Sequence, residues 1–512
     1  MNDVAVTHQS LAVLVRMLQS GEASAVDVMR GFLARISLTN PQLNAIVSLQ
    51  PEGLLLDEAK AADALCASGA ELGALHGVPI AVKDLEAVAG MRFTSGSPAC
   101  ADHVAEADSV MVARFRAAGA IIIGKTNVPE FGLGSHTFNP VFGVTRNPYD
   151  TRNSAGGSSG GAAAALAARM VPVADGSDAM GSLRNPAAYC SIYGFRPTPG
   201  LIPDTSCSGT APHERLSTLG PMARTVEDLA LLLDVQSGAH PRDPFSWSPS
   251  RPFSSAILDG APKTMRIGWL ADYGGSYTYE RGVRDLCESC LTHLTAHLGA
   301  HVTTVTPSTP AASLWNSWTT LRSAQKHRAG GLLADLYSEG ATRAMLKPEA
   351  IWEVERGMEL MRAKDGEQQL ARARLEREAW RAETRRLFEE FDLLALPAAA
   401  CFPFPAEQRH PTSISGRQMD TYHRWMEVVV PASLAALPAL CVPAGFSDGG
   451  LPIGMQLIGA ERADALVLAV GHAYCLSTRF HLIEPRISVT KPAADHPEHS
   501  DPHRGAPNAS KL

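Results

Sequence analysis

Two serine sites flanked by glycine lie close together between residues 154 and 187. The first is GGSSGG at 156–161 and the second is MGS at 180–182. Glycine beside a serine permits backbone conformations that are closed to other residues, and it lets a substrate approach the main chain closely. We therefore interpret both sites as parts of a functional centre rather than as packing features.

An upstream lysine could activate these serines. Lys83 ends the apolar run GVPIAVK, so its side chain can point into the interior or across the end of a sheet. Lysine acts as a base only when neutral, which requires burial to lower its pKa by roughly 3 units, or about 4 kcal/mol of differential solvation. The apolar run gives a physical reason for that shift.

Two other interpretations of the glycine-rich stretch stay open on these residues alone. GGSSGG could cradle a phosphate at a helix N-terminus, but no lysine follows at the Walker position and no acidic residue is placed as the dinucleotide-binding pattern requires. Residues 157–161 also match G-x-S-x-G, which would make Ser159 the nucleophile of an α/β-hydrolase. The preceding segment RNPYDTRNSA is polar, whereas such a nucleophile normally follows an apolar strand directly.

Short apolar runs alternate with helical patterns between residues 78 and 235. The runs VPIAV, AIIIG and VPVA are separated by helical segments at 109–118 and 161–169, and two more strand-like runs follow at 392–397 and 439–445. This alternation predicts a sheet covered by helices on both faces. We expect an α/β fold, a single large α/β/α sandwich whose mixed central sheet also recruits strands from late in the chain.

The chain divides into three predicted parts. Residues 1–70 form an N-terminal helical layer, in which the S-x-x-D spacing of Ser24 and Asp27 predicts a helix start. Residues 71–490 form the α/β/α domain, with a helical insert at 310–391 on the substrate side. Residues 491–512 are rich in Pro, His, Asp and Ser and are predicted to be disordered. They end in Ser-Lys-Leu, the address of peroxisomal import, but a three-residue match is too short to assign.

Composition and charge exclude several classes of function. The chain has 512 residues, 45% hydrophobic and 19% charged, and a formal net charge of -7, so no nucleic-acid partner is expected. It shows no signal peptide and no apolar run long enough to span a bilayer, which predicts a cytoplasmic protein without a membrane partner. The nine scattered cysteines fit a reducing compartment. The one CxxC, Cys287 and Cys290, lacks a second pair or nearby histidines, so we expect neither a metal nor a cofactor.

Taken together, these motifs resemble the amidase signature family, the Ser-Ser-Lys hydrolases. The similarity covers most of residues 70–235, returns at 390–475 and is weak between them. Six matching elements occur in the family's order: GVPIAVKD around Lys83, GAIIIGKTNVPEF at 119–131, SAGGSSGGAAAA from 154, GSDAMGSLRNPAA from 176, GPMARTVEDLALLLD from 220 and ALCVPAGFSDGGLPIGMQLIG from 439.

The resemblance implies a catalytic relay of three residues. The family's catalytic lysine falls on Lys83, its bridging serine, held in a cis peptide, on Ser158, and its nucleophile on Ser182. Neutral Lys83 would accept a proton from Ser158 as Ser158 accepts one from Ser182, which attacks the substrate carbonyl. The oxyanion would be held by backbone N–H groups of the nucleophile turn, namely those of Ala179, Met180, Gly181 and Ser182.

Supporting roles follow from the same resemblance. Gly157 would ease the cis peptide, and Ser159 would hydrogen-bond within the relay. Asp178 and Arg184 would pair to brace the oxyanion turn.

One position departs from the family. Met180 stands where relatives usually have the first glycine of Gly-Gly-Ser, so their pocket shape and rate do not transfer directly. Phe131 and Leu133, within segment 128–142, are expected to line the substrate pocket with the helices at 310–390.

These implications predict a metal-independent serine hydrolase that cleaves C–N bonds of small amides through an acyl-enzyme. A close alternative keeps the mechanism but takes carbamates, urethanes or aryl esters. An alternative of another class is an amidotransferase subunit that acts only within a complex. The expected partner is therefore a small amide or carbamate, and the expected state is a monomer or a homodimer.

Overall fold

A ten-stranded sheet forms the centre of the computed structural model, which describes residues 6–207, 210–327 and 331–487. Its strands come from residues as far apart as Pro79 and Ile458. In sheet order they are β2 (Ile121–Thr126), β1 (Pro79–Lys83), β5 (Val173–Asp178), β7 (Thr218–Ala223), β6 (Tyr193–Arg196), β13 (Ala439–Phe446), β14 (Pro452–Ile458), β10 (Leu393–Pro397), β8 (Met265–Trp269) and β9 (Ala300–Thr304).

Strand directions are mixed, as predicted. β1 runs parallel to both β2 and β5, and β8 runs parallel to β9 and β10. The strands between these groups pair antiparallel with their neighbours. The predicted α/β fold with a mixed central sheet is therefore confirmed.

Helices cover both faces of the sheet. Side chains alternate along a strand, so Leu440 contacts Gly471 of α17, whereas the next residue, Cys441, lies with Ala188 of α7 around Gly454. The covering helices are α5 (Val110–Ala117), α6 (Gly160–Ala167), α7 (Arg184–Tyr189), α8 (Val226–Gln236), α9 (Phe253–Ala256), α10 (Val283–Leu298) and α17 (Asp464–Thr478).

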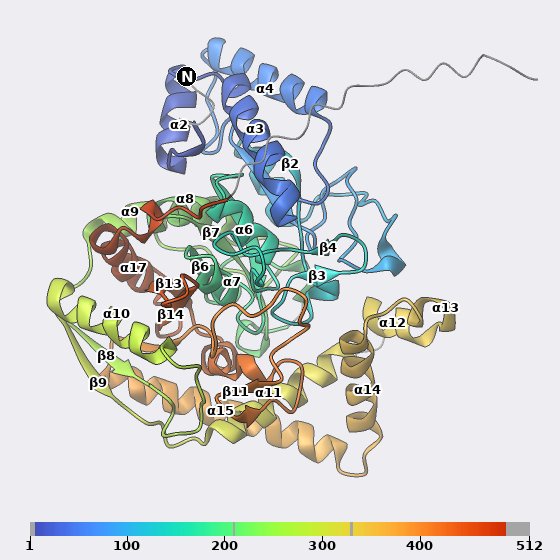
Figure 1. The fold of residues 1–512 in the computed structure, drawn as a ribbon, viewed down its shortest axis with the longest axis vertical. Helices are drawn as coiled ribbons and strands as arrows, with labels where there is room; N and C mark the ends of the chain where they lie inside the picture. Colours follow the sequence, from blue (N-terminus) through green and yellow to red (C-terminus); the bar gives the residue numbers. More distant parts are fainter. Residues whose placement is uncertain (1–5, 208–209, 328–330, 488–512) are drawn as a thin grey trace, which may run out of the picture.

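Three N-terminal helices pack at one end of the molecule, at the top of Figure 1. They are α2 (Leu11–Ser20), α3 (Ala25–Leu43) and α4 (Glu52–Ala67). The predicted helix start at Ser24 is confirmed, because its side chain accepts a hydrogen bond from Asp27 N at the first turn of α3.

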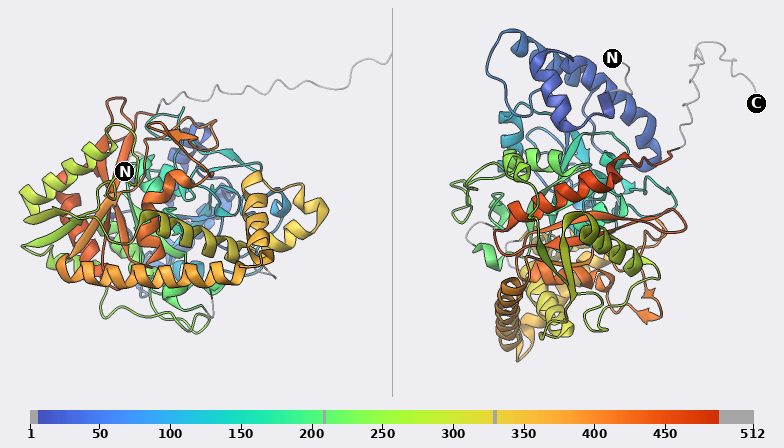
Figure 2. Two further views of the ribbon diagram at one scale, coloured as in Figure 1. Left: turned by 90° about the horizontal axis from the view of Figure 1, so that it is seen from below. Right: turned by 90° about the vertical axis from the view of Figure 1, so that its left-hand side faces the viewer.

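A second group of helices lies at the opposite end, as the right-hand view of Figure 2 shows. It contains α11 (Ala311–Lys326), α12 (Leu332–Ser338), α13 (Gly340–Arg343), α14 (Pro348–Arg362) and α15 (Gly366–Glu390), followed later in the chain by α16 (Val430–Leu434). We call α11–α15 the helical insert. α11 packs on both α14 and α15, and its Trp318 is fully buried.

Two short hairpins complete the described part of the chain. They pair β3 (Phe138–Asn139) with β4 (Gly143–Val144), and β11 (Ser413–Ile414) with β12 (Arg417–Gln418). None of the helices within the described ranges combines the length and apolarity needed to cross a bilayer. The predicted disordered tail, 491–512, lies outside the described residues.

The glycine pair that opens α6 allows this helix to press against the end of β2. A Cβ at Gly161 would collide with Asn127 N and lie 2.7 Å from Ala45 O, and neither backbone atom can move aside cheaply. By contrast, Gly53 in the first turn of α4 has open space around it.

Gly161→Ala should therefore destabilise the protein by about 1–3 kcal/mol through overpacking, whereas Gly53→Ala should be neutral or slightly stabilising. Urea unfolding followed by circular dichroism compares the two variants. An equal change in the free energy of unfolding for the two variants would contradict the close packing of α6 on β2.

Candidate active site

Lys83, the last residue of β1, lies fully buried among three serine hydroxyls. Its Nζ is 2.9 Å from Ser158 Oγ, 2.7 Å from Ser159 Oγ and 2.9 Å from Ser177 Oγ. The structure thus brings together the lysine and the first serine site singled out from the sequence. It adds Ser177, which sequence analysis did not identify.

The environment of Lys83 favours its neutral form. Burial lowers the pKa of Lys83 to about 7, against the opposing influence of the carboxylates of Asp175, Asp178 and Glu86. An amine with this pKa is partly neutral at neutral pH, so it can accept a proton there.

The first serine site lies in a tightly packed loop before α6. The Gly157–Ser158 peptide is cis, as the family resemblance implied. A Cβ at Gly157 would come within 3.0 Å of His136 N and Thr137 Oγ1. Glycine is therefore required where this loop meets segment 135–137.

The second serine site, at Ser182, lies just before α7 and next to the first. Ser159 N donates a hydrogen bond to Ser182 O at 3.2 Å, which joins the two loops. The Ser182 side chain is 7% exposed, and its hydroxyl makes no hydrogen bond to any residue that the structure describes. Ser182 is therefore buried but not sealed from solvent, and its hydroxyl is not hydrogen-bonded to Ser158.

The turn that carries Ser182 is braced by a buried ion pair. Arg184 donates to both carboxylate oxygens of Asp178 at 2.9 Å, and the carboxylate also accepts from Gly181 N at 2.8 Å and Leu183 N at 3.2 Å. Burial alone would raise the pKa of Asp178, but the guanidinium groups of Arg184 and Arg196 hold it well below its usual range. The carboxylate therefore stays ionised and holds the turn on two sides.

These contacts change the expected set of oxyanion donors. The Gly181 N–H is already used by Asp178, so it is not available to an oxyanion. The N–H groups of Ala179, Met180 and Ser182 make no hydrogen bond within the described residues. Three of the four expected donors thus remain available.

Arg184 also ties the nucleophile turn to the last strands of the sheet. It donates to Gln456 Oε1 at 2.7 Å, Ser433 Oγ at 2.7 Å and Val429 O at 3.0 Å. Gln456 in turn donates to Val428 O and Pro397 O. The turn therefore depends on segments more than 200 residues away in the sequence.

Apolar side chains surround the nucleophile turn. Met180 is 5% exposed and belongs to the main core, so its side chain packs inward. A Cβ at Gly181, whose φ is +81°, would come within 3.0 Å of Met426 and Val429. Met426 and Val429, in the 3-10 helix η6 (Arg424–Val429), thus form the wall next to Ser182.

The turn at 130–134 lies on the other side of the relay. Gly132 has a φ of +67°, and a Cβ there would meet Leu85 at 2.9 Å and Ser158 Oγ at 3.5 Å. Phe131 also has a positive φ, +51°, an uncommon conformation for a non-glycine residue and one that clusters at functional sites. The residue beside the bridging serine is therefore Gly132.

Leu133 and Phe131 instead contact the helical insert. Leu133 is buried in a second apolar cluster, and Phe131 packs against it partly exposed. The cluster's other buried members are Leu333, Leu346, Ala350 and Val354.

Polar contacts fasten the insert to the same turn. Glu130 accepts hydrogen bonds from Ser97 Oγ at 2.6 Å and from Lys347 N, at the start of α14, at 2.8 Å. Lys347 Nζ donates back to Leu133 O at 2.6 Å. The insert is thus held against the turn that contacts Ser158.

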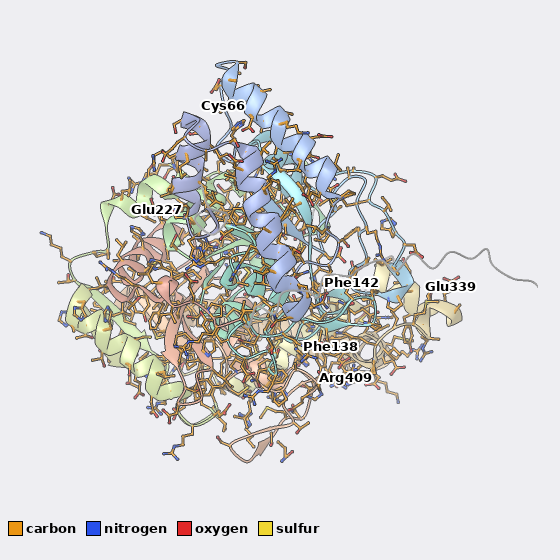
Figure 3. All side chains as sticks on the ribbon, turned by 45° about the horizontal axis from the view of Figure 1, so that its top comes forward. Cys66, Phe138, Phe142, Glu227, Glu339 and Arg409 are labelled. Atoms are coloured by element: carbon orange, nitrogen blue, oxygen red, sulfur yellow. The ribbon has the colours of Figure 1, made fainter. Side chains whose placement is uncertain are left out.

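Two cations flank Phe138 at this junction. The Arg409 guanidinium lies 5.0 Å from the ring centroid of Phe138, and Lys347 Nζ lies 5.5 Å from it. Figure 3 shows Phe138 and Arg409 near one another on the same side of the molecule. The Lys347 contact further joins the insert to the hairpin that carries Phe138.

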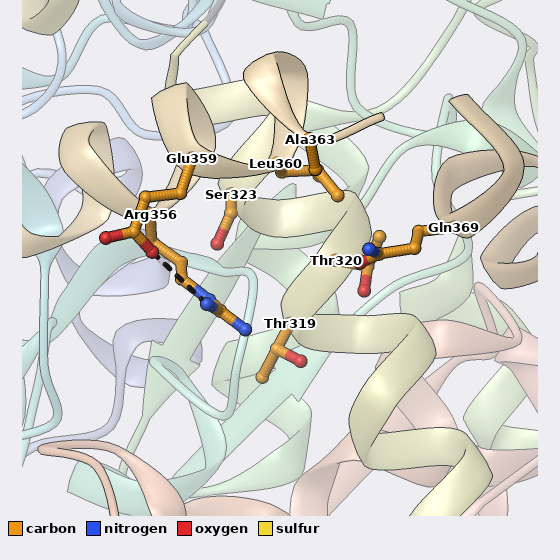
Figure 4. A pocket seen from close by; sticks show the side chains of 8 residues that line it. All are labelled: Thr319, Thr320, Ser323, Arg356, Glu359, Leu360, Ala363 and Gln369. Atoms are coloured by element: carbon orange, nitrogen blue, oxygen red, sulfur yellow. Dashed lines mark hydrogen bonds and ion pairs between the residues drawn. The ribbon is translucent and has the colours of Figure 1, made fainter. Parts of the chain in front are cut away.

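Two hollows in the insert do not include the relay. One of about 250 Å³ lies between α11, α14 and α15 and contains the Arg356–Glu359 ion pair (Figure 4). The other, of about 870 Å³, lies between segment 210–216 and the insert. Lys83, Ser158 and Ser182 line neither hollow. Among the described residues, no group of three or more His, Cys, Asp or Glu side chains could hold a metal ion.

Sequence analysis missed Ser177, Asp175 and Gly132. Asp175 and Ser177 are two positions apart on β5, so they point to the same side of that strand, toward Lys83. Alternating polar residues in the otherwise small and apolar segment VADGSD are the signal that could have identified them. Nothing in the sequence marked Gly132 apart from its place between Phe131 and Leu133.

Comparisons with known proteins agree on one family. The family model described as Amidase matches residues 27–468. An acylamidase of Rhodococcus erythropolis is 34% identical over 466 residues, covering 90% of this chain and 93% of that protein. A glutamyl-tRNA(Gln) amidotransferase subunit of Chloroflexus aurantiacus is 34% identical over 494 residues, covering 94% and 99%.

Solved structures show the same similarity. A bacterial aryl acylamidase of the amidase signature family superposes with a TM-score of 0.84 at 29% identity, covering 92% of this chain and 97% of that one. A 6-aminohexanoate cyclic dimer hydrolase in complex with its substrate superposes with a TM-score of 0.80 at 27% identity, covering 94% and 99%.

The ion pair beneath the nucleophile turn should dominate its stability. Asp178→Asn would leave Arg184 and Arg196 buried without a counter-charge, so we expect a loss of about 3–5 kcal/mol of unfolding free energy. The exposed pair of Asp57 and Lys60, at 2.8 Å, provides the control, and Asp57→Asn should change little. Denaturant unfolding measures both; a similarly small loss in the two variants would show that Asp178 does not hold the turn.

Proposed function

The chain belongs to the amidase signature family, an amide-hydrolysing family of enzymes, and from this premise we propose that it cleaves the C–N bond of small amides through an acyl-enzyme on Ser182. The observation that carries the proposal is the buried Lys83 amine among three serine hydroxyls at 2.7–2.9 Å. A fully charged ammonium ion would be costly in this position because it is removed from water.

The three hydroxyl partners are compatible with a neutral lysine. A neutral amine has two N–H donors and one lone pair, which matches three hydroxyl groups if two accept and one donates. In this arrangement Lys83 donates to Ser159 and Ser177, and Ser158 donates its proton to the lone pair. Lys83 then acts as a general base toward Ser158.

The reaction begins with two proton transfers. Ser158 gives its proton to Lys83 and takes the proton of Ser182. The Ser182 oxygen forms a bond to the substrate carbonyl carbon, and the resulting oxyanion accepts hydrogen bonds from the free N–H groups of Ala179, Met180 and Ser182. Each such donor is worth about 3–4 kcal/mol in comparable sites. As the C–N bond breaks, Ser158 gives a proton to the leaving amine and regains one from Lys83, which becomes neutral again. Water then cleaves the acyl-enzyme, releasing the acid and restoring Ser182.

The step between Ser182 and Ser158 requires a local rearrangement. Their hydroxyls are not hydrogen-bonded in the structure, although Ser159 N and Ser182 O hold the two loops together. Rotation of the unbonded Ser182 hydroxyl about its single side-chain torsion is the simplest way to close the relay. Catalytic hydrogen bonds commonly tighten only when substrate is bound.

The surroundings of Ser182 support substrates with an uncharged, apolar group. Met426 and Val429 pack against Gly181 in the Ser182 turn, and the partly exposed Leu85 packs against Gly132 beside Ser158. The similarity to an acylamidase and an aryl acylamidase favours amides. Carbamates, urethanes and aryl esters present the same kind of carbonyl and remain the alternative substrates.

An amidotransferase subunit is the second candidate function. The observation that favours it is the 34% identity to the glutamyl-tRNA(Gln) amidotransferase subunit of Chloroflexus aurantiacus, which equals the identity to the acylamidase. Turnover of simple amides by the purified chain alone would favour the hydrolase. The cytoplasmic location and the monomeric or homodimeric state stay predictions.

The nucleophile assignment can be tested with a panel of chromogenic amides, carbamates and esters, together with a fluorophosphonate probe. Ser182→Ala should lose turnover by roughly 10⁴-fold or more and should no longer be labelled, because the attacking oxygen is missing. Lys83→Ala should lose activity comparably, whereas the exposed Ser68→Ala serves as the control and should match wild type. Peptide mapping that finds the probe on Ser159 would contradict the assignment.

The base assignment predicts a pH dependence. The active form carries neutral Lys83, whose pKa burial lowers to about 7. The rate kcat/KM should therefore fall about tenfold per pH unit below pH 7 and level off above it. A profile that stays flat down to pH 5 would show that no group of this pKa acts as the base.

A further inference from the structure

Asp175 is a buried carboxylate next to the catalytic lysine that the proposed mechanism does not use. It lies on β5 with no exposed surface, and its Oδ1 accepts a hydrogen bond from Lys83 N at 2.9 Å. The parallel strands β1 and β5 are paired at Ala81 and Ala174, and the Asp175 side chain serves as acceptor for the backbone amide two residues further along β1. This bond fixes the carboxylate beside the start of the Lys83 side chain.

The second carboxylate oxygen has no hydrogen-bond partner. Asp175 Oδ2 is buried and unpartnered in the described structure. The neighbouring cation Lys125 is engaged elsewhere, because its Nζ lies 3.7 Å from Asp84 Oδ1 and donates to the Glu86 carbonyl. Asp175 therefore forms no salt bridge within the described residues, although the charges of Lys125 and Lys83 act on it.

Two other acidic residues, Asp178 and Glu86, lie near Lys83, but each differs from Asp175 in its ion pairing or its protonation. Asp178 is paired with Arg184 and Arg196. Burial raises the pKa of Glu86 to about 8, so this side chain is mostly neutral when Lys83 titrates near pH 7. Burial raises the pKa of Asp175 only to about 6. The hydrogen bond from the Lys83 backbone amide and the positive charges of Lys125 and Lys83 lower this pKa and so limit the rise. At pH 7 Asp175 is therefore the ionised, unpaired carboxylate near Lys83.

We propose that Asp175 is a positioning residue whose negative charge keeps the buried Lys83 amine basic enough to take a proton from Ser158, and so sets the lower pH limit of activity. The inference rests on the proposed function, because it assigns Asp175 a role through the catalytic base. Burial alone would make Lys83 a weak proton acceptor, and a base works best when its pKa is near the operating pH. Asp175 offsets part of the effect of burial.

The sign of the effect follows directly. A nearby negative charge stabilises the protonated form of Lys83. Without that charge, Lys83 loses its proton at lower pH, so the acidic limb of the rate profile moves to lower pH. The amine is then also a weaker base, so the plateau at high pH falls.

The test measures the second-order rate of fluorophosphonate labelling at Ser182 between pH 5 and pH 9, which needs no knowledge of the natural substrate. Asp175→Asn keeps an oxygen to accept from Lys83 N but removes the charge. We expect its acidic limb to shift down by on the order of one pH unit, with a several-fold lower plateau. A lower rate at every pH with an unmoved limb, or a limb shifted upward, would overturn the proposal.

Three further variants separate charge from packing. Asp175→Ser removes the charge without introducing an amide and should shift the limb in the same direction, which keeps the test valid if Asp175→Asn fails to fold. Asp175→Glu retains the charge and should keep the limb near its wild-type position. The matched control is Asp464→Asn: Asp464 is also buried, its pKa is also raised to about 6 by burial, and it also accepts from a backbone amide, that of Thr198. Asp464→Asn should leave the acidic limb of the labelling rate at the same pH as in wild type.

The result also separates this inference from the proposed function. If wild-type enzyme is not labelled at Ser182, or has no acidic limb, the assignment of the nucleophile or of the base fails first. If wild type is labelled at Ser182 with a limb near pH 7 and the charge-removing variants do not move that limb, only the role of Asp175 is wrong.

Discussion

The site depends on keeping a lysine amine neutral by burying it. Lys83 lies at the end of β1 with no exposed surface, and burial lowers its pKa to about 7. Removing a charge from water is costly, so an isolated amine in this position would be neutral but also a poor base. The surrounding serine hydroxyls hydrogen-bond to the amine, and the negative charge of Asp175 limits the lowering of its pKa. The sheet, its covering helices and the glycine-rich loops provide this enclosure.

A second buried charge, on Asp178, organises the turn before Ser182 rather than the surroundings of the Lys83 amine. Because Arg184 and Arg196 neutralise it, the carboxylate can hold Gly181 N and Leu183 N and so shape the turn before Ser182. Arg184 reaches on to Gln456 in β14. The nucleophile turn is therefore complete only once strands from the end of the chain have joined the sheet, which explains why one site uses residues from 83 to 456.

Sequence alone predicted the parts of the site that local patterns encode. Glycine beside Ser158 and Ser182, and an apolar run ending at Lys83, are visible without any structure, as is the alternation that predicts the α/β fold. Ser177 and Asp175 were missed because their role depends on how β5 aligns with β1. The use of the Gly181 amide by Asp178 was missed for a similar reason, since it depends on the geometry of one turn.

The residues expected to line the substrate pocket stay predictions, because long-range packing, which the sequence does not show, decides which side chains meet there. Leu133 was expected beside the substrate, yet it is buried against the insert, and Gly132 is the residue next to Ser158. The turn at 130–134 therefore has two sides: Gly132 contacts the relay, while Glu130 and Leu133 bind the start of α14. A change in the insert can therefore reach the surroundings of Ser158 through this turn, and it can reach the Ser182 turn through α16, where Trp380 donates to Pro431 O and Arg184 donates to Ser433. The structure thus separates the helices of the insert, which contact Glu130 and Leu133, from the buried groups around Lys83.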